Sequence, residues 1–211
     1  MTSRTVQRTD LIRNAARRHF ALHGYDGASM RDIAANSGIT IATLYFHCGT
    51  KEQLLFDVLE ERMQQLQSGS TAAVAQVTGD WSERLAAAIR FLVQFTARPD
   101  EGAAISTSEL RGLTGELRAR HLVTRDAYEH HIRELVRGGI DAGEFAPVEV
   151  PIVTAGIIGM CLTVARWYRV DGRLTPEQIA DEYVQLALRG LSRDAVSPER
   201  PRSRGNGRVA R

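Results

Sequence analysis

The stretch SMRDIAANSGITIATLYFHCGTKEQLL, residues 29–55, most strongly limits how this chain can fold. Ser29, Thr40 and Thr50 can each cap the start of a helix, because a hydroxyl oxygen accepts a hydrogen bond from a free amide of the first turn. Gly38 lies between the first two helices and permits a sharp turn, since glycine adopts positive φ without steric cost. The pattern predicts a helix-turn-helix followed by a third helix.

Apolar residues in the rest of the chain recur every three or four positions, which is the period of an amphipathic helix. One such stripe runs from Trp81 to Phe95, and a longer helix includes Tyr128. Residues 175–178, TPEQ, predict a capping box at the start of the last helix, and Thr50 with Gln53 predicts another. No stretch alternates with period two for long enough to indicate a sheet. The expected fold class is therefore all-α.

Three further features bear on the fold and its environment. Residues 67–80, QSGSTAAVAQVTGD, predict a helix end followed by a connection. The longest apolar run, residues 152–165, is shorter than the about 20 residues that span a bilayer, and it predicts a helix buried on most sides. Cys48 and Cys161 match no disulfide or zinc-site spacing, as expected of a cytoplasmic protein that does not enter the membrane.

Charge is distributed unevenly along the chain. Residues 1–51 carry seven Arg or Lys against three Asp or Glu, and residues 192–211 carry six against two. Since the whole chain has a formal net charge of +2, residues 52–191 have a net charge of −6. Residues 192–211 also lack apolar periodicity. With the helix-turn-helix pattern, these features predict a basic helix-turn-helix domain at 1–51, an acidic helical body at 52–191 and a disordered basic tail at 192–211.

The second helix of the helix-turn-helix has an exposed face suited to a DNA groove. Short side chains near its start, such as Ala42 and Thr43, permit close approach to the floor of the major groove, where methyl and hydroxyl groups can meet base edges. Tyr45, His47 and Lys51 can instead donate hydrogen bonds to phosphate oxygens. The alternative from periodicity alone is a pair of amphipathic helices in an ordinary bundle.

The segment from Ile12 to Val58, which contains AARRHFALHGYDGASMRDIAANSGITIATLYFHCGTKEQLL, resembles the DNA-binding domain of the TetR family of bacterial repressors. The resemblance implies one set of phosphate contacts and one set of base contacts. The phosphate set is Ser29, Tyr45, His47 and Lys51, and the base set is Arg31, Thr40, Ile41, Ala42 and Thr43. Cys48 stands at an inward position where the family usually has Phe, which predicts a looser core or an oxidisable thiol.

A single recognition helix reads few base pairs, so such proteins bind palindromic sites as two-fold dimers. The resemblance implies that the last two helices of each subunit form a four-helix bundle, and small residues in the apolar run would permit close helix approach. The candidate interface residues are Ala155, Gly156, Gly159, Tyr183 and Leu186. The alternative is that the apolar helix is central to its own subunit.

The other helices are expected to enclose a cavity for a small hydrophobic effector. The candidate lining residues are Trp81, Phe91, Phe95, Tyr128, His131 and Trp167, each of which could also be plain core. Residues 166–191, RWYRVDGRLTPEQIADEYVQLALRGL, are similar to a TetR subgroup that regulates lipid, steroid and acyl-CoA catabolism. That similarity favours an acyl-CoA thioester or another hydrophobic acid, and a repressor that such a ligand releases from its operator.

Two other classes of protein compete with a DNA-binding regulator. An enzyme could use His121 and the run Glu129-His130-His131, but adjacent histidines point to different sides of a helix and the HExxH spacing is absent. A membrane-surface or partner-binding protein would carry a basic amphipathic helix, whereas the basic residues here surround a helix-turn-helix pattern. The sequence therefore predicts a homodimeric regulator of double-stranded DNA, with no enzymatic activity, metal or cofactor.

Overall fold

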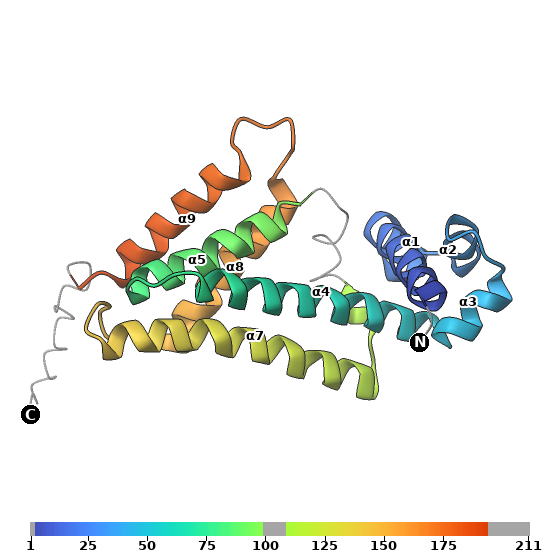
Figure 1. Cartoon of the computed structure of the whole chain (residues 1–211), viewed down its shortest axis with the longest axis horizontal. Coiled ribbons are helices and arrows are strands. Elements are labelled where there is room, and N and C mark those ends of the chain that lie inside the picture. Colours follow the sequence, from blue (N-terminus) through green and yellow to red (C-terminus); the bar gives the residue numbers. More distant parts are fainter. Residues whose placement is uncertain (1–2, 99–108, 194–211) are drawn as a thin grey trace, which may run out of the picture.

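The computed structural model describes residues 3–98 and 109–193, and every regular element within these ranges is helical (Figure 1). This confirms the predicted all-α fold. The elements in chain order are α1 (Ser3–Gly27), α2 (Met30–Asn36), α3 (Ile41–Cys48), α4 (Lys51–Ala75), α5 (Trp81–Thr96), η1 (Glu109–Gly112), α7 (Gly115–Asp141), α8 (Val150–Trp167) and α9 (Pro176–Leu191).

Helix α2, the turn at Gly38 and helix α3 form the predicted helix-turn-helix. The Ser29 hydroxyl accepts a hydrogen bond from the Asp32 amide at 3.4 Å, and the Thr40 hydroxyl accepts one from the Thr43 amide at 3.2 Å. Gly38 has φ of +67°, which a residue with a Cβ rarely adopts. Local chemistry therefore fixes both helix starts and the turn between them.

The N-terminal helices share one apolar core. Phe20 of α1, Ile33 of α2, Leu44 of α3 and Leu55 of α4 are each at most 1% exposed. The same core includes α4 residues as far as Leu59. The first turns of α4 are thus packed with the helix-turn-helix, while the rest of this long helix continues into the body (Figure 1).

The body is built around α5, which packs against α4, α7, α8 and α9. Figure 1 shows α4 and α7 running side by side, with α5 and α9 on the far side of α4 from α7, and α8 crossing behind them to pack against α5 and α7. Leu85, Ile89, Leu92 and Val93 of α5 are almost completely buried. Because α4 takes part in both cores, a change at α7 can reach the helix-turn-helix through one continuous helix.

Two predictions about helix boundaries are wrong. Residues 67–75 continue α4 instead of ending it, because this stretch packs closely: Ser70 is fully buried, and a Cβ on Gly69 would meet the Phe91 ring at 2.0 Å. Thr50 does cap α4, but the Gln53 side chain donates to Asp57 instead of returning to the Thr50 amide. The predicted capping box at residues 175–178 is complete.

The expectation that the apolar run is buried on most sides is also wrong. Helix α8 buries Thr154, Ile157, Cys161 and Val164 on one face, while Ile152 on the other is 72% exposed. Its length and mean hydropathy of 1.6 would suffice for a membrane span, and only 22% of it is buried in this chain. Most of the predicted basic tail, from residue 194 onward, lies outside the described residues.

Candidate DNA-binding and ligand-binding sites

Helix α3 exposes large apolar side chains on its outer face. Ile41 is 41% exposed, Tyr45 45% and Phe46 87%, whereas Leu44 and Cys48 point into the core. Leu44 and Cys48 are four residues apart, so they lie on one side of the helix and leave the opposite side open. A large exposed apolar surface of this kind marks an interaction site.

The residues predicted to contact bases lie along this face and the neighbouring turn. Thr40 and Ala42 are exposed, and Thr43 is half-buried. The Thr40 and Thr43 hydroxyl oxygens are 2.8 Å apart and share a hydrogen bond. Arg31 is exposed on α2, outside α3 itself. A helix start with short polar side chains and no bulky cover can enter the major groove.

The residues predicted to contact phosphates do not all project freely. Tyr45 is exposed, while Ser29 and His47 are half-buried. Lys51 folds back toward the end of α1: its Nζ donates to the Asp26 carbonyl oxygen at 3.3 Å and lies 4.8 Å from the centre of the Tyr25 ring. A phosphate would therefore compete with this carbonyl oxygen for the ammonium group.

Two further residues of α3 were expected to lie on opposite faces of the helix, and the structure places them so. Phe46, which the sequence placed on the exposed face without assigning it a DNA contact, is the most exposed large apolar residue of this helix. Burial raises the pKa of the Cys48 thiol to about 11. Since the thiolate is the reactive form, the predicted oxidisable thiol is disfavoured by this environment.

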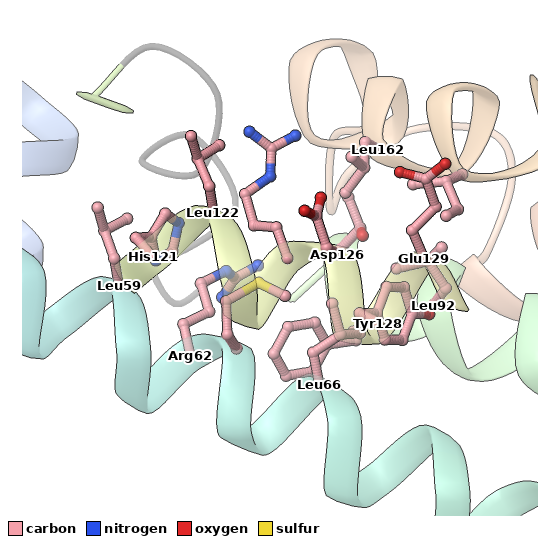
Figure 2. Close-up of a pocket in the computed structure, with 15 residues that line it drawn as sticks. Leu59, Arg62, Leu66, Leu92, His121, Leu122, Asp126, Tyr128, Glu129 and Leu162 are labelled. Atoms are coloured by element: carbon pink, nitrogen blue, oxygen red, sulfur yellow. The ribbon is translucent and has the colours of Figure 1, made fainter. Parts of the chain in front are cut away.

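A largely apolar cavity of about 210 Å³ lies between α4 and α7, with α5 and α8 closing it (Figure 2). Its lining comprises Leu59, Arg62, Met63 and Leu66 of α4, Leu92, Phe95 and Thr96 of α5, His121, Leu122, Arg125, Asp126, Tyr128 and Glu129 of α7, and Ile158 and Leu162 of α8. A concave apolar site with a few convergent polar groups is the usual form of a small-molecule site.

The structure brings only two of the six predicted lining residues to this cavity, Phe95 and Tyr128. The other four lie elsewhere. Trp81 covers Gly138 of α7, Phe91 covers Gly69 of α4, the His131 Nε2 is 3.3 Å from the Ser70 hydroxyl, and Trp167 is 47% exposed at the end of α8. Burial lowers the pKa of His131, which favours its neutral form. Helical periodicity identified inward faces but could not separate core from cavity wall.

His121 is a cavity residue that sequence reasoning did not place there. Its side chain is 2% exposed, and its Nδ1 lies 2.6 Å from the Glu60 Oε1. The Thr124 hydroxyl donates to the other Glu60 oxygen at 2.8 Å. His121 precedes Tyr128 by two helical turns, so this spacing could have placed both on one face of α7. Together these bonds tie α7 to α4 beside the cavity.

The remaining histidines of interest do not gather into a metal site. His130 is exposed, with its Nε2 4.0 Å from the Glu134 carboxylate, while His131 points toward Ser70. Among the residues that the structure describes, no three His, Cys, Asp or Glu side chains come together in a way that could hold a metal ion.

The outer faces of α8 and α9 carry the residues predicted for the dimer interface. Ala155, Gly156 and Gly159 are exposed, and a Cβ added at either glycine would meet nothing within 4 Å. Leu186 is 61% exposed and Tyr183 is half-buried. The residues that the structure describes leave these mostly small or apolar side chains uncovered.

Comparison with known proteins gives matches along most of the chain. Residues 12–58 match the family model for bacterial regulatory proteins of the tetR family, and residues 78–191 match the model for the tetracyclin repressor-like C-terminal domain. The transcriptional repressor KstR2 of Mycolicibacterium smegmatis is 26% identical over 201 residues, which cover 90% of this chain and 93% of that relative.

Two solved structures extend this similarity to the fold. The structure of AibR in complex with isovaleryl coenzyme A and operator DNA is 33% identical, with a TM-score of 0.79, and the match covers 85% of this chain and 97% of AibR. A tetR-family regulatory protein from Rhodococcus RHA1 is 28% identical, with a TM-score of 0.81 and coverage of 88% and 97%.

Proposed function

Since this chain belongs to the TetR family of bacterial transcriptional regulators, which are not enzymes, we propose that it is a ligand-responsive repressor. It binds a palindromic DNA operator as a homodimer in the cytoplasm and leaves the operator when a small hydrophobic effector binds. The outer face of α3 carries this proposal, because it exposes Ile41, Tyr45 and Phe46 beside the hydroxyls of Thr40 and Thr43. Such a face suits contact with thymine methyls and base edges.

We assign the two sets of DNA contacts as follows. The residues that read bases are Arg31, Thr40, Ile41, Ala42 and Thr43, and those that bind phosphates are Ser29, Tyr45, His47 and Lys51. Phe46 joins the groove-facing surface because of its exposure. Lys51 releases the Asp26 carbonyl when a phosphate takes its place, since a bond between two charged groups is stronger than one to a neutral carbonyl.

The dimer is formed through the exposed faces of α8 and α9. Ile152 and Leu186 lose water on association, and Gly156 and Gly159 let the helices of two copies approach closely. The two helix-turn-helix domains of the dimer are then held at a fixed spacing, which matches the two half-sites of a palindrome. This assigns residues 1–51 to DNA binding and residues 52–191 to dimerisation and effector binding.

The cavity between α4 and α7 receives the effector. Leu59 supports this assignment, because it lines the cavity and also belongs to the core of the helix-turn-helix domain. A ligand that separates α4 from α7 would therefore move the helix-turn-helix domain. If the ligand binds better to this displaced state, it reduces the fraction of the protein that can bind DNA. The similarity to AibR, whose structure contains isovaleryl coenzyme A, supports an acyl-CoA or related lipid metabolite.

The test recovers genomic DNA fragments that the full-length protein binds, and then measures their release by acyl-CoA compounds. We expect recovered fragments to share a palindrome, and a subset of acyl-CoA thioesters to lower the affinity for it by at least tenfold. If the recovered fragments shared no sequence, the assignment of a specific operator would be contradicted. If they shared a palindrome but no acyl-CoA compound lowered the affinity for it, only the proposed class of effector would be contradicted.

A further inference from the structure

Two buried hydroxyl groups in the wall of the cavity lack hydrogen-bond partners. Thr96 is 2% exposed and Tyr128 is 3% exposed, and both residues line the cavity. Neither the Thr96 Oγ1 nor the Tyr128 hydroxyl oxygen makes a hydrogen bond to any residue that the structure describes. Ser70 is the polar side chain beside the Tyr128 hydroxyl, but no bond of normal geometry joins them.

Such groups are uncommon because an unpaired buried hydroxyl costs about 1 to 3 kcal/mol. A threonine in a helix usually avoids this cost by donating to a carbonyl oxygen of the preceding turn. Thr96 does not, although it lies in the last turn of α5. Its hydroxyl is therefore a buried donor without a partner, in a side chain that lines the cavity.

Three other polar groups of the wall have partners, and of the remaining two charged residues Arg125 is half-buried and Asp126 is exposed. His121 is bonded to Glu60, Glu129 pairs with Arg133, and the Arg62 guanidinium lies 4.5 Å from the centre of the Phe95 ring. Burial raises the pKa of Tyr128, so its phenol stays protonated and can donate. The fully buried groups without partners are thus two O–H donors among apolar side chains, and such donors match a neutral acceptor oxygen better than a carboxylate.

We propose, on the basis of the effector site above, that the ligand places a carbonyl oxygen inside the cavity, where the hydroxyls of Thr96 and Tyr128 donate to it. The apolar group attached to that carbonyl is short. A cavity of about 150 Å³ holds benzene, so 210 Å³ holds an acyl group only slightly larger. A thioester of a short branched acid meets both requirements, and its carrier lies outside the cavity.

The first experiment needs no ligand. It compares the melting temperature of the full-length protein with those of Thr96→Val and of Thr71→Val, whose threonine is exposed on α4 away from the cavity. Because valine replaces an unpaired hydroxyl by a methyl of similar size, Thr96→Val should raise the melting temperature by about 2 to 4 °C, and Thr71→Val should leave it nearly unchanged. A lower melting temperature for Thr96→Val would show that the hydroxyl is paired within the protein and would overturn the inference.

The second experiment uses two probes that differ in one oxygen: isovaleryl-CoA and its thioether S-(3-methylbutyl)-CoA, which lacks the carbonyl. Calorimetry should show that the wild-type protein prefers the thioester by about tenfold, the gain expected from a buried hydrogen bond. Thr96→Val and Tyr128→Phe should each reduce this preference to about threefold or less, while Thr71→Val retains it.

The outcomes separate this inference from the proposed function. Equal binding of thioester and thioether by the wild-type protein would overturn the carbonyl assignment while leaving an acyl-CoA effector intact. Tighter binding of palmitoyl-CoA than of isovaleryl-CoA would overturn the size limit. Failure of every acyl-CoA to bind would instead reject the effector class of the proposed function, and the assignment of a thioester with it.

Discussion

Helix α3 and helix α8 both present apolar side chains to solvent, but their surroundings differ. Phe46 of α3 is 87% exposed and Ile152 of α8 is 72% exposed. The α3 face adjoins the hydroxyls of Thr40 and Thr43, whereas α8 has a single charged residue, Arg166, over its whole length. Exposed apolar area therefore marks both as interaction surfaces, and the neighbouring polar groups indicate which partner each one suits.

The largest expected effect comes from a charge placed on the exposed face of α8, which tests whether this face forms the dimer interface while the α3 face binds DNA. Gly156→Glu adds a side chain where the chain itself leaves open space, so the monomer should fold and gain about 0.5 to 1 kcal/mol from improved helix propensity. Two buried like charges would oppose dimerisation, and we expect a monomer with at least 100-fold weaker operator binding. Sedimentation measures the first effect and DNA titration the second.

Gln94→Glu, on an exposed position of α5, is the matched control for the added charge. It should sediment as the wild-type protein does and bind the operator with similar affinity. A Gly156→Glu protein that remained dimeric would exclude this face of α8 as the interface.

A change on the α3 face should alter which sequence is preferred. Thr43→Val keeps a branched side chain but removes the hydroxyl, and we expect a loss of about 1 to 3 kcal/mol of discrimination at one base pair in each half-site. Binding to a panel of single-base operator variants measures this loss. If preference stayed intact in Thr43→Val and disappeared in Arg31→Ala, base reading would belong to α2 instead.

Removal of the Lys51 charge should weaken binding without changing the preferred sequence. Lys51→Ala is expected to reduce affinity several-fold for all sequences and to lower the slope of log affinity against log salt by about one per half-site. Titrations between low and moderate salt measure the slope. Lys51→Arg should keep the slope, and a Lys51→Ala protein with an unchanged slope would show that Lys51 stays bound to the Asp26 carbonyl.

Cys48, on the inward face of α3, should make the stability of the protein depend on pH, and it is not expected to affect DNA binding directly. The pKa of Cys48 is about 11 in the folded protein, above its ordinary value of 9.0. Its contribution to stability is therefore complete below about pH 9 and is lost as pH rises toward 11. Urea unfolding of the wild type and of Cys48→Ala should show a stability difference that shrinks by about 2 kcal/mol between pH 8 and pH 10.5. A constant difference would contradict the burial of this thiol.

Short-range signals allowed correct prediction of the helix starts and the turn. Thr40 caps α3 and Thr175 caps α9 as expected, because a cap depends on residues within one turn of each other. The continuation of α4 beyond residue 67 was mispredicted, since its small residues read locally as a helix end. Packing of Gly69 beneath Phe91 overrides that local preference.

The cavity could be predicted only in part. The spacing of Phe95 and Tyr128 marks inward faces, yet Trp81 and Phe91 have the same character and pack as core. No periodic pattern distinguishes a wall that faces a void from one that faces another side chain. The spacing of His121 from Tyr128 indicates the same face of α7, but its contact with Glu60 spans 61 residues of sequence and could not be predicted locally.

The sequence by itself determined the helix-turn-helix and the chemistry of its outer face, because caps, a glycine turn and helical periodicity act over a few residues. Tertiary structure alone decided where α8 is uncovered, which side chains surround the cavity and which hydroxyls in its wall stay unpaired. These features depend on how helices distant in sequence cross, and the shape between crossing helices is set by the fit of all their side chains together.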